Sequence, residues 1–200
     1  MMMPKSLCLM TTVISLILAG SLEAKPMKVY ILAGQSNMQG HANIETIPYM
    51  SKNVATKALH DKIVGAQGEH KIYENVRVSY LTDRETLKEG ALTVGYGARP
   101  TLIGPELSFG ITLQESIKEP ILLIKTAWGG HSLNTNFRPP SAGPYVYDEE
   151  MAKRKMKHEK ISLDEINTRK AKHTGVSYKM MMDHVKSVLS DPGKVHPDYD

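Results

Sequence analysis

The sequence predicts an α/β fold, in which the buried strands of a parallel sheet alternate with helices. Residues 27–33 and 120–127 are two short, nearly continuous apolar runs. Strands that are covered on both faces of a parallel sheet carry apolar residues without alternation. A turn that contains glycine follows each run, and a helix start lies between the two runs. Strand, helix and strand in this order are the pattern of α/β proteins.

The remaining elements are predicted from local signals. Residues 76–81 alternate and indicate a half-buried or edge strand. The segment 105–118 begins with proline and glutamate, which suit the first turn of a helix. The methionine-rich stretch 176–189 has apolar residues at helical spacing, which predicts a helix packed on the core. Residues 148–173 carry many charges of both signs, so we expect a solvated helix or a mobile insertion, with a basic patch for an anionic substrate as the alternative.

The composition is that of one ordinary globular domain. The chain has 200 residues, of which 41% are hydrophobic and 23% are charged, and this excludes collagen-like and fully disordered classes. Mean hydropathy is −0.30. The sequence contains no apolar run of the roughly 18 residues that a membrane span needs, which excludes a polytopic membrane protein. The net charge of +4 is too small to indicate nucleic-acid binding.

The N-terminus has the anatomy of a secretory signal peptide at residues 1–24. Lys5 forms a small positive region, residues 7–19 are mostly apolar, and Ala24 offers a small residue for cleavage. Cleavage a few residues earlier and an uncleaved anchor are the alternatives. The single cysteine, Cys8, lies in this segment. We therefore expect a chain exported to the periplasm or the extracellular space, without disulfides and without stable membrane insertion.

The most informative segment is Gly-Gln-Ser-Asn-Met-Gln-Gly at residues 34–40, directly after the first predicted strand. Its serine, Ser36, lies at the carboxyl end of a strand, where open α/β sheets build their sites. A helix that begins just after the serine would direct free backbone N–H groups at an oxyanion formed there. The alternative is that Ser36 only caps this helix.

A second informative segment follows the strand at residues 120–127. Gly129 and Gly130 permit positive φ angles and a close approach of the backbone to a ligand, or they form an ordinary strand-to-helix turn. Trp128 is either a pocket wall for a sugar or a core residue. Arg138 suits a substrate carboxylate, or it forms a surface salt bridge.

Three motifs in a fixed order carry a family resemblance. GQSNM after the strand KVYILA, then IGPELSFG, then ILLIKTAWGGHSL resemble the sialate O-acetylesterase-like branch of the SGNH hydrolase superfamily, whose members are carbohydrate acetylesterases. The likeness covers residues 28–133 and extends more loosely to the helix near Lys186. It implies a flavodoxin-like three-layer α/β/α sandwich and a serine nucleophile. It also implies an acetylated carbohydrate as substrate and no metal, cofactor or nucleic acid.

The resemblance assigns roles to individual residues. Ser36 matches the nucleophile, and its own backbone N–H is one oxyanion donor. The second donor falls on Gly130, with Gly129 as the near alternative. Gln35 and Asn37 belong to the first motif and fix its turn. The candidate substrate-binding residues are Gln35, Asn37, Trp128, His131 and Arg138.

The sequence departs from this family at the C-terminal motifs. The family takes its general base from the histidine of a D-x-x-H motif, and a side-chain oxyanion donor from a further motif of the G-x-N-D type. None of the eight histidines here follows an aspartate by three residues. We therefore expect residues 25–200 to be a partial domain, truncated at its C-terminus. His41 and His131 lie next to the two motif loops, either as substitute bases or as ordinary loop and pocket-lining histidines.

The leading interpretation is an exported carbohydrate O-acetylesterase that is catalytically incomplete. The alternatives are a non-catalytic carbohydrate-binding or interaction protein on the same fold, and an SGNH esterase that acts on lipid or aryl esters. In a flavodoxin-like order the strand at residues 121–127 lies inside the sheet, between the first strand and a fourth strand that these residues lack. Its second edge would then be unpaired, which favours aggregation.

Overall fold

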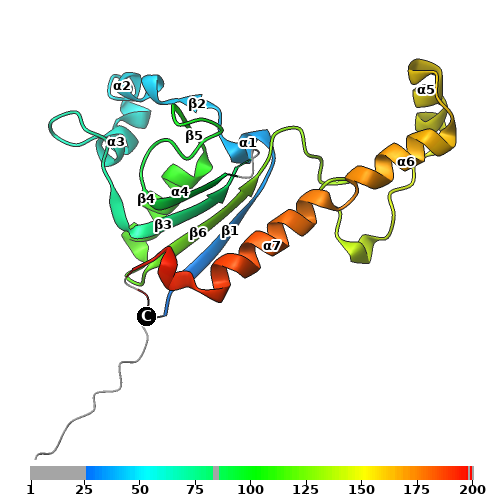
Figure 1. The fold of residues 1–200 in the computed structure, drawn as a ribbon. Helices are drawn as coiled ribbons and strands as arrows, with labels where there is room; N and C mark the ends of the chain where they lie inside the picture. Colours follow the sequence, from blue (N-terminus) through cyan, green and yellow to red (C-terminus); the bar gives the residue numbers. More distant parts are fainter. Residues whose placement is uncertain (1–25, 83–85, 198, 200) are drawn as a thin grey trace, which may run out of the picture.

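The computed structural model describes residues 26–82, 86–197 and 199, and the predicted signal peptide with Cys8 lies outside the described residues. A four-stranded sheet in the order β1-β6-β3-β4 forms the centre (Figure 1). Its strands are β1 (Lys28–Gly34), β3 (Tyr73–Leu81), β4 (Leu87–Leu92) and β6 (Ile121–Ala127). Strands β1, β6 and β3 are parallel, whereas β4 is antiparallel to β3. A separate antiparallel pair consists of β2 (Ala42–Asn43) and β5 (Leu102–Ile103).

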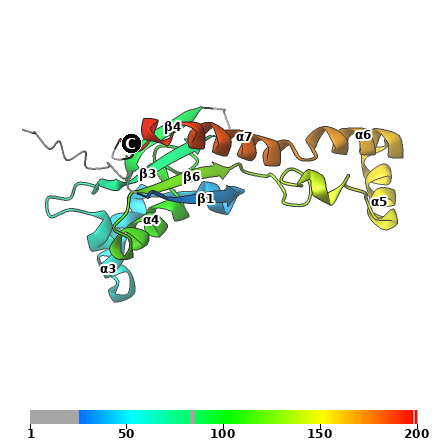
Figure 2. The ribbon, with the colours of Figure 1, turned by 90° about the horizontal axis from the view of Figure 1, so that it is seen from below.

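Helices cover both faces of this sheet and give the molecule three layers (Figure 2). The helices are α1 (Ser36–Gln39), α2 (Ile47–Met50), α3 (Val54–Ile63), α4 (Pro105–Ser116), α5 (Glu149–Glu159), α6 (Leu163–His173) and α7 (Val176–Ser190), with 3₁₀ turns at Ile44–Thr46, Pro140–Ala142 and Pro192–Lys194. Helix α4 packs on one face of the sheet and α7 on the other. Helices α5 and α6 form a hairpin that projects beyond the end of the sheet (Figure 2). The predicted flavodoxin-like α/β/α sandwich is confirmed.

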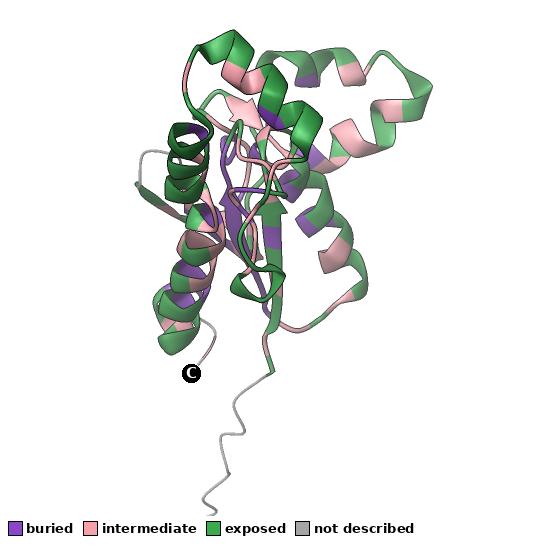
Figure 3. Ribbon diagram, turned by 90° about the vertical axis from the view of Figure 1, so that its right-hand side faces the viewer, coloured by how far each residue is buried: buried purple, intermediate pink, exposed green. Residues whose placement is uncertain are grey.

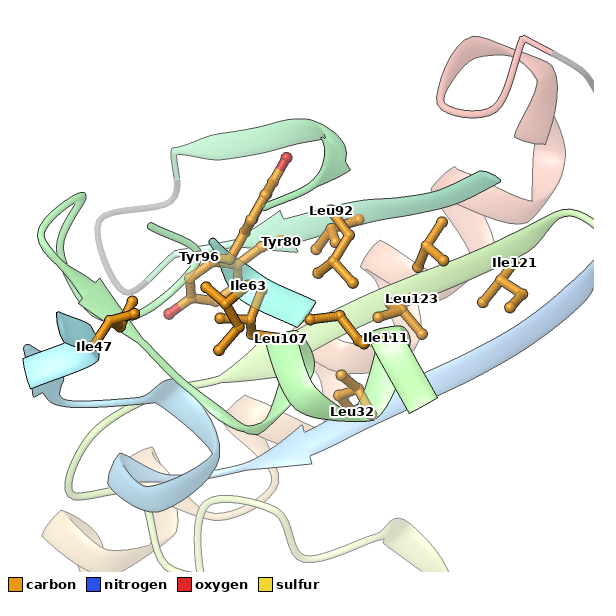
Figure 4. Packing of buried hydrophobic residues seen from close by; sticks show 12 residues of the cluster. Leu32, Ile47, Ile63, Tyr80, Leu92, Tyr96, Leu107, Ile111, Ile121 and Leu123 are labelled. Carbon is orange, nitrogen blue, oxygen red and sulfur yellow. The ribbon is translucent and has the colours of Figure 1, made fainter. Parts of the chain in front are cut away.

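Strand β6 is the centre of the hydrophobic core, because every one of its residues is buried. Its successive side chains point to opposite faces of the sheet and so join two clusters. The cluster on the α4 side includes Leu107, Ile111, Ile121 and Leu123 (Figure 4). The cluster on the α7 side includes Leu122, Ile124, Val185 and Val188. The burial predicted for this strand on both faces is confirmed, and Figure 3 shows the buried residues concentrated between the helical layers.

The prediction that residues 27–33 are buried on both faces is wrong. Strand β1 lies at the edge of the sheet and, among the described residues, pairs with β6 alone. Val29 and Ile31 are therefore 36% and 50% exposed. The interior position predicted for residues 121–127 is confirmed, but the neighbour on the second side is β3. The unpaired edge consequently belongs to β1 and not to β6.

Strand β3 is not an edge strand, because β4 folds back on it as a hairpin partner. The sequence of β4, Leu-Lys-Glu-Gly-Ala-Leu, mixes charges and a glycine with its apolar residues and has no clear strand signal. The helix predicted at residues 105–118 ends at Ser116, and the helix predicted at residues 176–189 is confirmed as α7. The charged segment 148–173 forms α5 and α6.

Truncation of Leu123 tests this core. Leu123→Ala removes a fully buried side chain between β6 and α4. We expect the free energy of unfolding to fall by about 2–5 kcal/mol, because lost burial and a new cavity add. Val54→Ala, at a residue that is 95% exposed, is the control and should change it by less than about 0.5 kcal/mol. Urea unfolding followed by circular dichroism measures both, and two equally small effects would contradict this account of the core.

Candidate active site

Ser36 lies at the carboxyl end of β1, beside the loop that follows β6. The parallel register pairs Gly34 with Ala127, and the N–H of Trp128 donates to the carbonyl of Gly34 over 3.2 Å. Both strands thus end at the same edge of the sheet, where open α/β sheets bind their ligands. The two segments that the sequence singles out are therefore neighbours in the fold.

The hydroxyl of Ser36 is not used as a helix cap. Ser36 is the first residue of α1, and Gln35 takes the capping position without a side-chain hydrogen bond. In the part of the chain that the structure describes, the Ser36 hydroxyl has no hydrogen-bond partner. The residue is half-buried, while Gln35 and Asn37 on either side of it are exposed. The hydroxyl is thus open to a reaction partner.

The glycine loop after β6 lies directly against α1. Gly129 and Gly130 are both exposed. Gly130 has a φ of 77°, a left-handed conformation that side chains disfavour, in agreement with the freedom predicted for this turn. A Cβ atom on Gly129 would lie 3.0 Å from Oε1 of Gln39. The loop therefore packs on the last residue of the serine helix.

A fully buried ion pair joins this edge of the sheet to the surrounding segments. The ammonium of Lys125 in β6 lies 2.6 Å from Oε2 of Glu106 in α4, and neither side chain is exposed. Lys125 Nζ also donates to the carbonyls of Gln39, over 2.8 Å, and Tyr96, over 2.7 Å. Oε1 of Glu106 accepts the N–H of Gly104 over 2.9 Å. Three donors and both carboxylate oxygens are thus used, as a buried pair requires.

This ion pair positions the serine helix. Gln39 ends α1, one helical turn after Ser36, so the hydrogen bond from Lys125 fixes that end of the helix to the sheet. Burial lowers the pKa of Lys125, and the carboxylate of Glu106 opposes this shift. The ring of Tyr80 lies 4.8 Å from the ammonium and adds a cation–π contact. Lys125 is therefore a positioning residue that acts through α1.

Two cavities open at this edge and meet at His41. The smaller cavity has a volume of about 360 Å³ and is lined by Ser36, Asn37 and His41, among others. The larger cavity has a volume of about 740 Å³, and Gln39 and Arg99 are in its wall together with His41. Volumes of several hundred Å³ are usual for small-molecule sites. The pair of cavities can therefore take a ligand larger than an acetyl group.

The two histidines beside the motif loops have different surroundings. His41 is exposed and lines the cavity of Ser36. His131 is half-buried, and its Nδ1 lies 2.6 Å from Oγ of Ser177 at the start of α7. Ser177 thus orients the His131 ring, and no local pattern reveals this partner because 46 residues separate the two. Among the described residues, neither histidine is hydrogen-bonded to Ser36.

The sequence leaves two positions open for Trp128, a pocket wall or the core, and the structure places it in the core. Its side chain is 1% exposed. Its Nε1 donates to the carbonyls of Leu81, over 3.1 Å, and Thr82, over 3.2 Å. Its ring stacks on Phe137 with 5.6 Å between the centroids. Trp128 therefore ties the glycine loop to the end of β3.

Arg138 supports the loop that leads to the α5–α6 hairpin. Its guanidinium donates to the carbonyls of Gly143, over 2.7 Å, and Ala142, over 2.6 Å. It also donates to Oδ1 of Asn134 over 3.1 Å. Arg138 lines a separate cavity of about 640 Å³ beside α7. The structure therefore does not bring Arg138 to the Ser36 cavity, and its donors hold its own loop.

Sequence reasoning missed Lys125, Glu106 and Gln39 as residues of the site. A lysine inside an apolar, buried strand is a usable signal, because a buried ammonium must have acceptors. The helix dipole alone explains a glutamate in the first turn of a helix. The position of Glu106 in the sequence therefore gives no reason to expect a buried lysine as its partner. Gln39 is 2% exposed, and its Nε2 has no hydrogen-bond partner among the described residues.

Within residues 26–82 and 86–197, no group of three or more histidine, cysteine, aspartate or glutamate side chains is arranged to hold a metal ion. No helix in the described part of the chain is both long and apolar enough to cross a membrane.

Ser36 and the glycine loop thus lie at the carboxyl ends of neighbouring parallel strands, the place where open α/β enzymes build their sites. The sequence model of the family described as carbohydrate esterase, sialic acid-specific acetylesterase, matches residues 26–168. The chain belongs to this family.

Solved structures and curated proteins give two further findings. One solved structure that the chain resembles is a carbohydrate acetylesterase from Xanthomonas citri, with 14% sequence identity and a TM-score of 0.34. The match covers 57% of this chain and 24% of that one, so the matched part of this chain spans about a quarter of the length of that protein. A search of curated proteins gives no match.

The buried ion pair predicts strong coupling between Lys125 and Glu106. Lys125→Met leaves the Glu106 carboxylate buried without its ammonium, so we expect the free energy of unfolding to fall by about 3–5 kcal/mol. The double variant Lys125→Met, Glu106→Leu removes both charges and should be less destabilised than the sum of the two single variants. Chemical unfolding of the four proteins gives the coupling energy.

The exposed pair of Lys153 and Glu149 is the matched control for this cycle. Its side chains are 67% and 83% exposed, so the same substitutions there should give a coupling energy below about 1 kcal/mol. Simple additivity at Lys125 and Glu106 would contradict the role given to the buried pair.

Proposed function

We propose that this chain supplies the nucleophile and the oxyanion donors of a carbohydrate O-acetylesterase, which hydrolyses acetyl esters on sugars. The observation that carries the proposal is the Ser36 hydroxyl, without a partner among the described residues, at the end of β1 and next to the glycine loop. The family supports ester hydrolysis, since its description names a sialic acid-specific acetylesterase. Export through residues 1–24 is part of the proposal and would bring the protein to extracellular or periplasmic sugars.

In the first half of the reaction, Oγ of Ser36 attacks the acetyl carbonyl carbon while its proton passes to a general base. The carbonyl oxygen becomes an oxyanion, which the backbone N–H groups of Ser36 and Gly130 stabilise. The bond between the carbonyl carbon and the sugar oxygen then breaks, and the sugar hydroxyl leaves with the proton from the base. The acetyl group is now bound to Ser36.

In the second half, a water molecule attacks the acetyl-serine and gives its proton to the same base. The same two N–H groups hold the second oxyanion. Acetate leaves as the bond to Oγ breaks, and Ser36 regains its proton. We propose that the base is a histidine outside these 200 residues, because none of the eight histidines present has the D-x-x-H spacing.

Added imidazole should replace part of the missing base. We expect the full chain to release acetate slowly from an O-acetylated sugar, and imidazole to increase the rate about tenfold, a fraction of the roughly 10²–10⁴ that a positioned base supplies. A sugar acetate is the substrate of choice, since imidazole alone cleaves activated aryl acetates. Enzymatic detection of acetate measures the rate.

Serine variants distinguish hydrolysis that depends on Ser36 from hydrolysis that does not. Ser36→Ala should lose the imidazole-dependent increase and keep the free energy of unfolding within about 0.5 kcal/mol, because its hydroxyl has no partner among the described residues. Ser141→Ala, at an exposed serine, should keep the increase. Equal rates for Ser36→Ala and the unaltered chain would contradict the role of Ser36 as the nucleophile. They would favour the alternative of a non-catalytic carbohydrate-binding protein.

A further outcome concerns the base itself. Efficient turnover without imidazole that still depends on Ser36 would contradict a base outside the chain. It would assign that role to His41, which lines the Ser36 cavity, or to His131, which Ser177 orients. The variants His41→Gln and His131→Gln distinguish these two residues.

A further inference from the structure

The oxyanion donor assigned to Gly130 lies in a loop that has little support of its own. Gly129 and Gly130 are both exposed, and a Cβ atom on Gly130 would meet no described atom within 4 Å other than those of its chain neighbours. Over the ranges that the structure describes, the N–H of Gly130 has no hydrogen-bond partner. This N–H is therefore free to bind an oxyanion, but the residues around it must hold it in place.

The residues on either side of the two glycines are both fixed. Trp128, before them, is buried, and its Nε1 donates to the end of β3. His131, after them, is half-buried, and its backbone N–H donates to the carbonyl of Trp128 over 3.4 Å. This hydrogen bond closes the turn that contains the glycines. The glycine loop is therefore attached to the protein at both of its ends.

The attachment at His131 is a hydrogen bond to α7. Nδ1 of His131 lies 2.6 Å from Oγ of Ser177, and this hydroxyl has no other partner in the described part of the chain. Ser177 is fully buried in the first turn of the 15-residue helix α7. The helix packs on β6 with Val185 and Val188. The ring of His131 is therefore fixed to a part of the core.

The backbone beyond His131 is joined to the same helix. The carbonyl of Asn136 accepts the N–H groups of Ser177, over 2.9 Å, and Tyr178, over 3.1 Å, and so satisfies two of the donors that a helix start leaves free. Oδ1 of Asn136 accepts the N–H of Ser132 over 2.9 Å. The loop after β6 and the start of α7 thus form one hydrogen-bonded unit. Of these contacts with α7, that of His131 is the nearest to Gly130 along the chain.

We propose that His131 is a positioning residue for the oxyanion donor. Its hydrogen bond to Ser177 holds the N–H of Gly130 where the oxyanion forms, since a displacement of about 1 Å can lower a rate 10²-fold. The start of α7 thereby contributes to a site at the ends of β1 and β6. The proposal rests on the proposed function and deepens it, because it gives a role to a histidine that is not the base.

Variants of the full chain test this role in the imidazole-dependent hydrolysis of an O-acetylated sugar. His131→Ala and Ser177→Ala should each lower kcat about tenfold, less than the roughly 10²–10³ that the loss of an oxyanion donor costs. KM should change by less than about twofold, because the N–H of Gly130 gains its partner only as the oxyanion forms. The double variant should be no slower than either single variant, since both remove the same hydrogen bond.

Two conservative variants distinguish positioning from direct action on the substrate. The amide of His131→Asn takes the place of Nδ1 and can bond to Ser177, whereas the amide of His131→Gln takes the place of Nε2. We expect His131→Asn to keep most of kcat and His131→Gln to lose it. The opposite result would place Nε2 in contact with the substrate and overturn the proposal.

His60→Ala is the matched control. His60 is also half-buried and its Nδ1 is also hydrogen-bonded, to Oδ1 of Asp61 over 2.9 Å, but it lies in α3. Its substitution should leave kcat unchanged. Circular dichroism checks that each variant is folded. An equal loss of kcat in His60→Ala and His131→Ala would overturn the proposal.

A second measurement does not depend on activity. NMR relaxation of the backbone amides gives the order parameter of Gly130, which we expect to be about 0.85 in the unaltered chain and below about 0.6 in His131→Ala and Ser177→Ala. His131→Asn and His60→Ala should keep the high value. Equal order at Gly130 in all of these proteins would overturn the proposal.

The two measurements separate this proposal from the catalytic function. A Ser36-dependent rate that His131→Ala leaves unchanged would overturn the positioning role and leave the esterase intact. Loss of order at Gly130 in a chain without any Ser36-dependent rate would overturn the esterase, and with it the role of His131 in the reaction.

Discussion

A lysine and a glutamate without exposed surface hold together four segments of this molecule. Lys125 and Glu106 join β6 to α4, and their hydrogen bonds reach the end of α1 and the loop at Tyr96. Removal of two charges from water is unfavourable by several kcal/mol per ion, and the pair is tolerable only because its hydrogen-bonding positions are used. A shift of any one segment would leave a buried donor or acceptor unpaired. The wall of both cavities therefore depends on this contact.

The nucleophile and the oxyanion loop meet because two parallel strands are in register. Gly34 pairs with Ala127, so the residues that follow each strand emerge at the same edge. Neither Ser36 nor Gly130 has to be carried there by a long loop. A rigid sheet holds its strand ends more accurately than a loop holds its tip, which suits a reaction sensitive to small displacements.

Much of this arrangement can be predicted from the sequence, and the rest depends on contacts between distant segments. The burial of β6 and the place of Ser36 follow from local apolar runs and from the motifs after them. The exposure of β1 cannot be predicted in this way. An apolar run indicates that a strand suits a core, but it does not indicate how many neighbouring strands it has in the sheet. Strand β4 is missed because its two charged residues and its glycine interrupt the apolar pattern that would indicate a strand. The pair of Lys125 and Glu106 spans 19 residues and is fixed only when β6 and α4 pack.

The α5–α6 hairpin is stabilised mainly by local contacts within the hairpin. Each of its helices buries a single residue, Ala152 in α5 and Ile166 in α6. The capping of α5 by Asp148 and exposed pairs such as that of Lys153 with Glu149 contribute about 1 kcal/mol or less each. We therefore expect the hairpin to open as its own cooperative unit while the sheet remains folded. Its backbone amides should then exchange with solvent hydrogen far sooner than those of β6, which gives the protein two levels of local stability rather than one.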